Sequence, residues 1–553
     1  MKHLFFRIFI ILLIPLLSLS SCSDDDDLTA GKVVDGEVLT NAEAISLANA
    51  VYPPLQTLSS SFSFLIESAT ESTISFEGEE SKEGPLVSRF EIYPDNWYAV
   101  KIFNRLYESI GAANSAIDKL STATPSNQLS QETIKLAIAR VKFVRALSYH
   151  YLVQLFGEVP LVLTTTTPPS KVRASIDDVY AQIVKDLTEA EADLPAFDND
   201  KSNPTKGAAN AILARVYLVW GEKPLSFNEV AAIQGGQIDP SSNGVDVDKL
   251  QKAVEYASKV INSGSYTLLS DYEKIFGRNN ENSAEAIFTI FHLGDDVDRQ
   301  GNHQTHCPFT FPFELRKDNH IGPADVTLPN RFDDHDSRKH YSYATKLTNP
   351  ADNKEYTYAF PDTTPRYGKF IHRAADGSDL TQAAQPNDLD RIEIRLAELY
   401  LIRAEALFFL NKAGEALTDV NTIRARAFKG YYDHNKLSAL TKEDLFKEWE
   451  LEFTFEQKRW SNLVRWRNLI STVKTVDQFT YYKDDYKDEA SIIAKFGKDA
   501  DGKDVDINAA FFAKIYKHLH AKYTNVRGKH YRFPIPPGES GQDLGITPQN
   551  PGY

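Results

Sequence analysis

A segment near the middle of the chain gathers residue types that bind metal ions. His303, His306 and Cys307 stand just after an aspartate-rich stretch that includes Asp295 and Asp298. Imidazole and thiolate groups suit a transition metal, whereas the carboxylates alone would suit calcium. The pattern also fits a polar loop with two solvated histidines and a buried thiol, because spacing does not supply the geometry of a metal site. We therefore predict no cofactor, leave calcium open, and leave the metal unknown.

Common catalytic motifs are missing from the sequence. There is no G-x-S-x-G nucleophile elbow, no H-E-x-x-H metal motif, no P-loop and no C-x-x-C pair. Acidic pairs such as Asp333 with Asp334, or Glu398 with Glu405, imitate glycosidase carboxylates, but sequence spacing does not fix their separation in space. With 76 acidic residues in the chain, chance pairs are expected. We predict that the protein is not an enzyme.

The composition excludes several classes of protein. Of 553 residues, 42% are hydrophobic and 25% are charged, as in a soluble globular protein and unlike a disordered chain or a polytopic membrane protein. Acidic residues outnumber basic ones by 76 to 61, and the net charge of −15 argues against a nucleic-acid partner. Two cysteines are too few for a disulfide scaffold.

The N-terminus has the pattern of an export signal. A basic start precedes the apolar run Ile8–Leu17, which is too short to span a bilayer as a helix. Leu19–Cys22 resembles a bacterial lipobox, in which the cysteine becomes the lipidated first residue of the mature protein. We predict a lipoprotein signal peptide over residues 1–21 and a lipid anchor on Cys22. The alternative is a plain signal peptide with a chance cysteine.

An acidic block, Asp24–Asp27, follows this cysteine almost directly. Because like charges cannot pack together, residues 22–40 are predicted to form a solvated, lipidated tether. The block also resembles the acidic signal that sends Bacteroidetes lipoproteins across the outer membrane to face outwards. A plain spacer is the alternative.

Helical periodicity dominates most of the remaining chain. The stretch Ile134–Phe156 places apolar residues along one face at i, i+3, i+4 spacing, and Gly157 supplies a stop. Ser175 and Thr441 each stand three residues before an aspartate, a pattern that starts a helix. The second of these helices is predicted to run to about Trp466.

Two helix pairs resemble tetratricopeptide-type hairpins. Thr205–Trp220 is expected to pair with Leu250–Asn262, and Ile392–Leu410 with Gly414–Ala427. Small residues such as Gly207 stand at inward positions beside large ones, which lets two helices approach closely. Ordinary helix packing explains the pattern nearly as well, so a regular repeat array is not predicted.

Long stretches without a helical pattern lie between these blocks, at about 67–95, 293–390 and 476–530. Loops of this length are usually functional or disordered, and the aromatic residues that these stretches hold argue against disorder. We expect ordered loops that form a recognition surface on a rigid scaffold.

Several runs of the sequence, taken in order, resemble the SusD/RagB family of Bacteroidetes outer-membrane nutrient-binding lipoproteins. Their number, order and spread over nearly all of the mature chain carry the resemblance, and the lipobox agrees with it. The matching runs are Asn96–Asp118, Val141–Pro160, Ser175–Pro195, Thr205–Trp220, Ala253–Leu269, Ile394–Ala427, Leu451–Trp466, Phe533–Pro536 and Gln549–Tyr553.

The resemblance implies a mainly α fold, with a single large domain over residues 41–553, tetratricopeptide-like helix pairs and long ligand-face loops. It also implies a binding protein without catalytic activity, anchored by lipid in the outer membrane and facing the cell exterior. Such a protein captures an oligosaccharide, or in some branches a peptide, and passes it to a SusC-like TonB-dependent transporter. One departure is that Glu450–Trp460 lacks the basic residues usual at this place, which puts the local ion pairing in doubt but not the fold.

Sugar recognition uses aromatic faces against the pyranose ring and planar polar groups for its hydroxyls. By resemblance, the loop-to-helix junction around Trp97 is often on the ligand face, although packing at the helix start explains this residue equally well. The 303–320 segment is a second region, even though the alternating phenylalanines there also suit a strand with one apolar face. The candidate ligand-binding residues are Tyr93, Asp95, Asn96, Trp97, His303, His306, Phe309 and Phe311.

Other aromatic and charged residues lie on helical stripes. We predict that Trp460, Trp466, Tyr217 and Trp220 belong to the core, and that Arg145, inside an apolar helix, is a structural ion-pair partner.

Three alternatives to glycan binding stay open. A peptide or amino-acid ligand would call for a deep polar pocket with charged clamps. A surface hydrolase would need two loop carboxylates at glycosidase distance. A purely structural scaffold would present a flat and featureless loop face.

Overall fold

The helices begin where polar side chains can cap them. The computed structural model describes residues 39–75, 83–165, 171–276, 280, 282–292, 321–349, 354–357, 365–369, 390–499, 501–537 and 545–553. In three successive helices, a hydroxyl side chain accepts a hydrogen bond from a backbone N–H of the first turn. These are α6 (Gln131–Phe156) capped by Ser130, α7 (Ile176–Asp193) capped by Ser175, and α8 (Lys206–Gly221) capped by Thr205.

The described chain is mainly helical, as predicted. The other α-helices are α1 (Asn41–Asn49), α2 (Tyr52–Gln56), α3 (Ser59–Phe62), α4 (Glu83–Ser88), α5 (Trp97–Thr122), α9 (Phe227–Ile233), α10 (Val247–Ile261), α11 (Arg338–Ser342), α12 (Leu396–Phe409), α13 (Ala413–Phe428), α14 (Tyr432–Asn435), α15 (Lys442–Glu452), α16 (Arg459–Arg465), α17 (Leu469–Val473), α18 (Glu489–Phe496) and α19 (Ala509–Asn525). Shorter helical turns are η1 (Ser63–Glu67), η2 (Tyr272–Lys274), η5 (Leu328–Arg331), η6 (Lys429–Tyr431), η7 (Lys474–Gln478), η8 (Thr480–Tyr482), η9 (Asp484–Tyr486) and η10 (Gly528–Tyr531).

The strands form two-stranded antiparallel sheets. The pairs are β1 (Thr73–Ser75) with β3 (Ile321–Pro323), β2 (Ala286–Ile290) with β8 (Arg391–Arg395), β4 (Tyr343–Ala344) with β7 (Arg366–Tyr367), and β5 (Lys346–Asn349) with β6 (Lys354–Thr357). Strand β2 is fully buried and pairs with β8. Strand β8 continues directly into α12, without a connecting loop.

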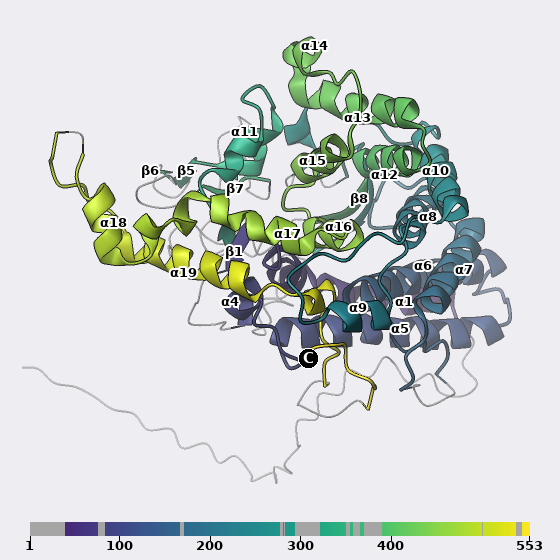
Figure 1. The fold of residues 1–553 in the computed structure, drawn as a ribbon. Helices are drawn as coiled ribbons and strands as arrows, with labels where there is room; N and C mark the ends of the chain where they lie inside the picture. Colours follow the sequence, from purple (N-terminus) through teal and green to yellow (C-terminus); the bar gives the residue numbers. More distant parts are fainter. Residues whose placement is uncertain are drawn as a thin grey trace, which may run out of the picture. The chain divides into compact units, whose positions relative to one another are not determined.

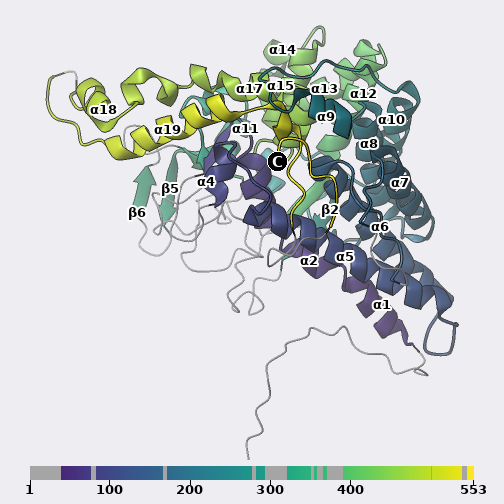
Figure 2. The same cartoon turned by 60° about the horizontal axis from the view of Figure 1, so that its bottom comes forward.

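Tetratricopeptide-like helix pairs are present as predicted. Helix α8 packs against α10, and α12 packs against α13, while α10 and α12 join the two pairs. Figure 1 shows these helices beside α6 and α7, and Figure 2 shows the same grouping from a second side. A Cβ on Gly207 would overlap the hydroxyl of Tyr266, which follows α10, and a Cβ on Gly221 would lie 2.8 Å from the side chain of Leu250 in α10. At both places a small residue of α8 lets a large side chain approach closely.

Two boundaries predicted from the sequence are wrong. The helix expected from Ile392 begins only at Leu396, because the preceding residues form β8. The long helix expected from Thr441 to Trp466 is two helices, α15 and α16, separated by a turn in which Phe455 and Gln457 have positive φ angles of 63° and 62°. This turn brings Glu456 beside Glu452, so that both carboxylates reach Arg395.

Most of the described buried apolar residues fall into two clusters. The larger, called here the helical core, is built mainly from α1, α2, α5–α8, α10, α12, α13, α15 and α16. The smaller, called the outer core, consists of Ile74, Ala324, Leu328, Phe332, Tyr343, Tyr367, Leu451, Phe455, Val476, Phe479, Tyr481, Tyr486, Ile492, Ala509, Phe511, Phe512, Ala513, Ile515 and Leu519. Much of it comes from α18, α19 and η7–η9, so the prediction of an irregular stretch at 476–530 is wrong.

Most predictions about the core are confirmed. Trp460 is fully buried and Trp466 is 7% exposed, whereas Tyr217 and Trp220 are half-buried and pack against the edge of the helical core. Arg145 is a structural ion-pair partner, since its guanidinium donates to both oxygens of Asp186 at 2.7 and 2.8 Å.

Candidate functional site

The side chain of Trp97 stands out among the candidate residues because half of it is exposed, at 50% of its full accessibility. It is the first residue of α5, and the cap residue Asn96 starts the helix by accepting a hydrogen bond from the N–H of Ala99 at 3.3 Å. The helix start therefore fixes the backbone from which the indole projects. Trp97 therefore packs at the start of the helix and also exposes half of its side chain to solvent.

Two side chains contact this indole, and a third packs behind one of them. Tyr98 meets it edge-on with ring centres 5.0 Å apart, and Phe64 of η1 stacks on Tyr98 at 4.9 Å with an interplanar angle of 9°. The ammonium group of Lys101, one turn further along α5, lies 4.7 Å from the centre of the indole. An aromatic ring held in this way loses little conformational freedom when a ligand stacks on it.

The neighbouring candidates are arranged around one carboxylate. The hydroxyl of Tyr93 donates to both oxygens of Glu83 at 2.7 Å, and the side-chain amide of Asn96 donates to the same carboxylate at 2.9 Å. Burial, followed by the contact with Glu83, raises the pKa of Tyr93, so its hydroxyl keeps its proton. Asp95 is exposed beside Trp97. The structure thus brings the four described candidates together, two facing Glu83 and two facing solvent.

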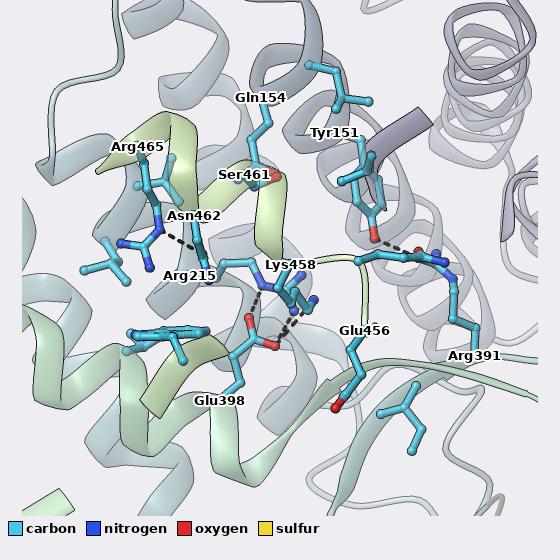
Figure 3. A pocket seen from close by; sticks show the side chains of 18 of the residues that line it. Tyr151, Gln154, Arg215, Arg391, Glu398, Glu456, Lys458, Ser461, Asn462 and Arg465 are labelled. Carbon is cyan, nitrogen blue, oxygen red and sulfur yellow. Dashed lines mark hydrogen bonds and ion pairs between the residues drawn. The ribbon is translucent and has the colours of Figure 1, made fainter. Parts of the chain in front are cut away.

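A partly open cavity of about 90 Å³ lies between α6, α8, α12, α16 and β8. Figure 3 shows its polar wall, in which Arg215 and Lys458 both point at Glu398, and Tyr151 points at Arg391. Arg215 donates to Glu398 at 2.6 Å, and the ammonium of Lys458 lies 3.5 Å from the same carboxylate.

The charges on this wall are engaged with one another. Arg215 also donates to Glu393 at 2.6 Å, and the guanidinium of Arg391 lies 3.1 Å from that carboxylate. Arginine and lysine hold the pKa of the buried Glu393 down to about 2, against the effect of burial. Ligand pockets usually measure about 300–1,000 Å³, so this cavity suits a few ordered water molecules better than a sugar. The exposed Trp97 surface is the stronger candidate for ligand binding.

The segment Glu450–Trp460, whose ion pairing was in doubt, takes part in a dense buried network. Arg395 uses all five N–H groups, donating to Glu285, Glu452 and Glu456 and to the carbonyl of Glu452 at 2.5–2.9 Å. Burial alone would raise the pKa of Glu452, but Arg426, Arg395 and Arg338 hold it far below its ordinary value. We call this network the ionic seam; its members are Glu285, Asp336, Arg338, Lys369, Arg395, Arg426, Glu448, Glu452 and Glu456.

The acidic pairs that imitate glycosidase carboxylates are each bound elsewhere. Glu398 pairs with Arg215, whereas Glu405 accepts hydrogen bonds from Arg465 and from the indole of Trp466. Asp333 contacts His335 and Asp334 contacts Lys339 at the surface. These contacts give the four acids structural partners.

Several candidates lie outside the described residues. They are Cys22, His303, His306, Cys307, Phe309 and Phe311, together with the signal peptide and most of the acidic tether. Among the residues that the structure describes, no three metal-binding side chains come together. No helix in this same part of the chain is both long and apolar enough to cross a membrane.

Sequence reasoning missed the residues that hold the site in place. Glu83 and Phe64 lie up to thirty-odd residues before Trp97 in the chain. Lys101 lies on a buried face of its helix and is 6% exposed. The available signal was local for Lys101, which stands four residues after Trp97 on the same helix face. No periodic signal marks Glu83 or Phe64.

Two protein-family models match most of the chain. Residues 275–553, half of the chain, match the SusD family, and residues 49–218 match a family described as starch-binding and associating with the outer membrane. A SusD-like protein of Bacteroides ovatus is 26% identical over 422 residues, covering 72% of this chain and 70% of its own. The starch-binding protein SusD of Bacteroides thetaiotaomicron is 26% identical over 442 residues, covering 70% and 73%.

Solved structures have the same fold. A SusD superfamily protein of Parabacteroides distasonis superposes with a TM-score of 0.66 at 22% identity, covering 94% of this chain and 100% of its own. A laminarin-binding SusD-like protein superposes with a TM-score of 0.63 at 22% identity, covering 93% and 99%. Family match, relatives and fold agree, and the chain belongs to the SusD/RagB family.

Proposed function

We propose that this protein is a cell-surface lipoprotein that binds a glycan through Trp97 and passes it to a SusC-like TonB-dependent transporter in the outer membrane. It acts by capture and release, without a catalytic step. The observation that carries the proposal is the half-exposed indole of Trp97, which contacts Tyr98 and Lys101, with Phe64 stacked on Tyr98.

The chemistry of this surface suits a sugar. The exposed face of an indole packs against the apolar face of a pyranose ring, and the exposed carboxylate of Asp95 next to it can accept hydrogen bonds from sugar hydroxyls. The starch-binding and laminarin-binding relatives support this ligand class. A peptide ligand is less favoured, because the charged groups of the cavity are already paired with one another.

The lipid anchor and the outward orientation rest on the lipobox-like Leu19–Cys22 and on the acidic block that follows it. The match to a family that associates with the outer membrane supports the same location. Replacing Cys22 by alanine in the full-length chain should release the protein from the membrane fraction. Retention of the variant in that fraction would contradict the anchor.

Binding to a panel of ligands tests the glycan proposal. Laminarin, xyloglucan and soluble starch represent neutral glycans, and a mixture of tryptic peptides represents the alternative; titration calorimetry measures each. We expect binding to at least one glycan, a loss of about tenfold or more with Trp97→Ala, and partial retention with Trp97→Phe, because the ring face is what binds.

A matched control is available in the same chain. Phe197 is 46% exposed and also has a lysine ammonium, that of Lys201, 4.2 Å from its ring centre. Phe197→Ala should leave binding unchanged. Binding of peptides alone, or cleavage of a glycan in the same cell, would contradict the proposal.

A further inference from the structure

A second group of aromatic side chains lies on the solvent side of α19. Tyr516, His520 and Tyr523 follow one another at i, i+4, i+7 spacing, and Tyr482 of η8 lies against all three. The ring centre of Tyr482 is 6.0 Å from that of Tyr516, 5.9 Å from that of His520 and 5.4 Å from that of Tyr523. We call these four residues the tyrosine patch. Figure 1 labels α19, the helix that carries three of these residues and packs against η7 and η8.

The opposite face of α19 fixes this patch in place. Phe512, Ile515 and Leu519 are fully buried in the outer core, while Lys522 donates from the same buried side to the carbonyls of Ser68 and Thr70. The helix therefore cannot turn its aromatic side inward. Along the helix axis the patch extends about 10 Å, at about 1.5 Å per residue.

The patch is partly accessible to solvent. The three tyrosines are half-buried and His520 is exposed. Among the described residues, the hydroxyls of these tyrosines have no hydrogen-bond partner. Aromatic rings with unsatisfied polar tips can stack on an apolar ring face and hydrogen-bond at its edge at the same time.

Two charged groups of opposite sign act directly on the tyrosines of the patch. The ammonium of Lys474 lies 5.5 Å from the ring centre of Tyr523 and donates to Gln237 at 3.1 Å, while Asp477 lies close enough to Tyr482 to act on its hydroxyl electrostatically. These direct contacts give no preference for a polyanion such as nucleic acid or an acidic lipid surface. The four side chains also include no aliphatic residue that would enter a bilayer.

We propose that the tyrosine patch is a second binding surface for a neutral polysaccharide, separate from Trp97. The inference rests on the proposed function for its ligand class and extends it to a second position on the chain. Two weak contacts on one polymer raise its apparent affinity well above that of either contact alone. The patch should therefore matter for long chains and not for short oligosaccharides.

Hydroxyl-radical footprinting read by mass spectrometry tests the contact on the unmodified protein. Laminarin, xyloglucan and soluble starch are the probes, and Tyr431, which is 51% exposed on another helical turn, is the internal control. We expect the polysaccharide that binds to lower the oxidation of Tyr482, Tyr516 and Tyr523 but not that of Tyr431. Protection by lipid vesicles, with none by any polysaccharide, would overturn the proposal.

A variant gives the second readout. Tyr482→Ala combined with Tyr523→Ala should weaken binding of the polysaccharide by about tenfold or more while leaving a short oligosaccharide of the same sugar unaffected, as expected when one of two linked contacts is lost. Circular dichroism checks that the variant folds. Wild-type binding that depends on Trp97 but shows neither protection nor this loss overturns the second surface alone. Absence of any glycan binding by the wild type overturns both proposals.

Discussion

The helical core and the outer core differ in how their residues are brought together. In the helical core, residues close in sequence supply whole faces, as in α6, where Phe143, Leu147 and Leu155 are all buried on one helix. In the outer core, the stretch from Val476 to Leu519 supplies eleven of the nineteen residues, and short segments far away in the chain supply the rest, such as Ile74 and Tyr343. The helical core follows from local periodicity, whereas the outer core also needs segments that are distant in the sequence.

Helix α15 and the turn after it show how the two clusters are joined. Leu445, Trp449 and Phe453 recur every four residues and enter the helical core, whereas Leu451 and Phe455 enter the outer core. A third row with the same spacing, Glu448, Glu452 and Glu456, belongs to the ionic seam. The two apolar clusters are therefore linked through charged groups that are stable only when every partner is in place.

Removing the central cation of the seam should have the largest effect. Arg395→Met would leave Glu285, Glu452 and Glu456 short of a partner in a buried site, and we expect a loss of roughly 3–5 kcal/mol in the free energy of unfolding. Urea denaturation measures it. The exposed ion pair of Lys252 with Glu255 provides the control, since Lys252→Met should leave stability unchanged. Equal stability of the two variants would refute a structural role for the seam.

Creating a cavity in one core at a time should show how far the loss of stability spreads through the molecule. Phe512→Ala and Phe143→Ala each remove a fully buried ring, at a cost of roughly 3 kcal/mol or more. Because the outer core is the smaller cluster and is separate from the helical core, Phe512→Ala should speed hydrogen exchange in α19 by about a hundredfold while sparing α6. Phe143→Ala should affect both regions, since the outer core rests on the helical core through α15. Uniform loss of protection with Phe512→Ala would show a single cooperative unit instead.

A smaller, pH-dependent effect should arise at Glu67, which binds the turn between α15 and α16. One of its oxygens accepts a hydrogen bond from the backbone N–H of Gln457 at 2.6 Å, and burial raises the pKa of Glu67 to about 7. The protonated side chain is therefore favoured by folding. Its stabilising contribution is complete below pH 4.5 and is lost as the pH rises through about 7.

The neutral variant Glu67→Gln removes this dependence. We expect the Tm of the variant minus the Tm of the wild type to be about 1–3 °C larger at pH 8 than at pH 5, measured by calorimetry. Burial also lowers the pKa of Lys522 to about 7, but this group is present in both proteins and cancels in the comparison. A difference in Tm that does not change with pH would contradict the assignment.

The contrast between the cores also explains what the sequence could predict. Helix starts at Ser175 and Thr441, the stop at Gly157 and the pairing of α8 with α10 follow from caps and spacing within one segment. The break after Glu452 does not, because it depends on Arg395, which lies more than fifty residues earlier in the chain. Two local patterns of charge did point toward buried ion pairs: the alternation of Arg391, Glu393 and Arg395 in β8, and the four-residue spacing of Glu448, Glu452 and Glu456.

The residues of the candidate site also divide into those with a local sequence signal and those without one. An aromatic residue just after a helix cap pointed to Trp97, and its exposure makes it available to a ligand. Its support comes from Phe64 of η1 and Glu83 of α4, which no local pattern connects to it. The tyrosine patch likewise needs Tyr482 from η8 to complete the row on α19.

Iodide quenching of tryptophan fluorescence tests the central claim about Trp97 most directly. Of the five tryptophans, Trp97 is 50% exposed, Trp220 is half-buried, and Trp449, Trp460 and Trp466 are buried. Quenching should therefore report mainly on Trp97 and should be largely absent in Trp97→Phe. The account predicts that the glycan bound by the wild type lowers quenching by iodide. Saturation with that glycan and no change in quenching would contradict it.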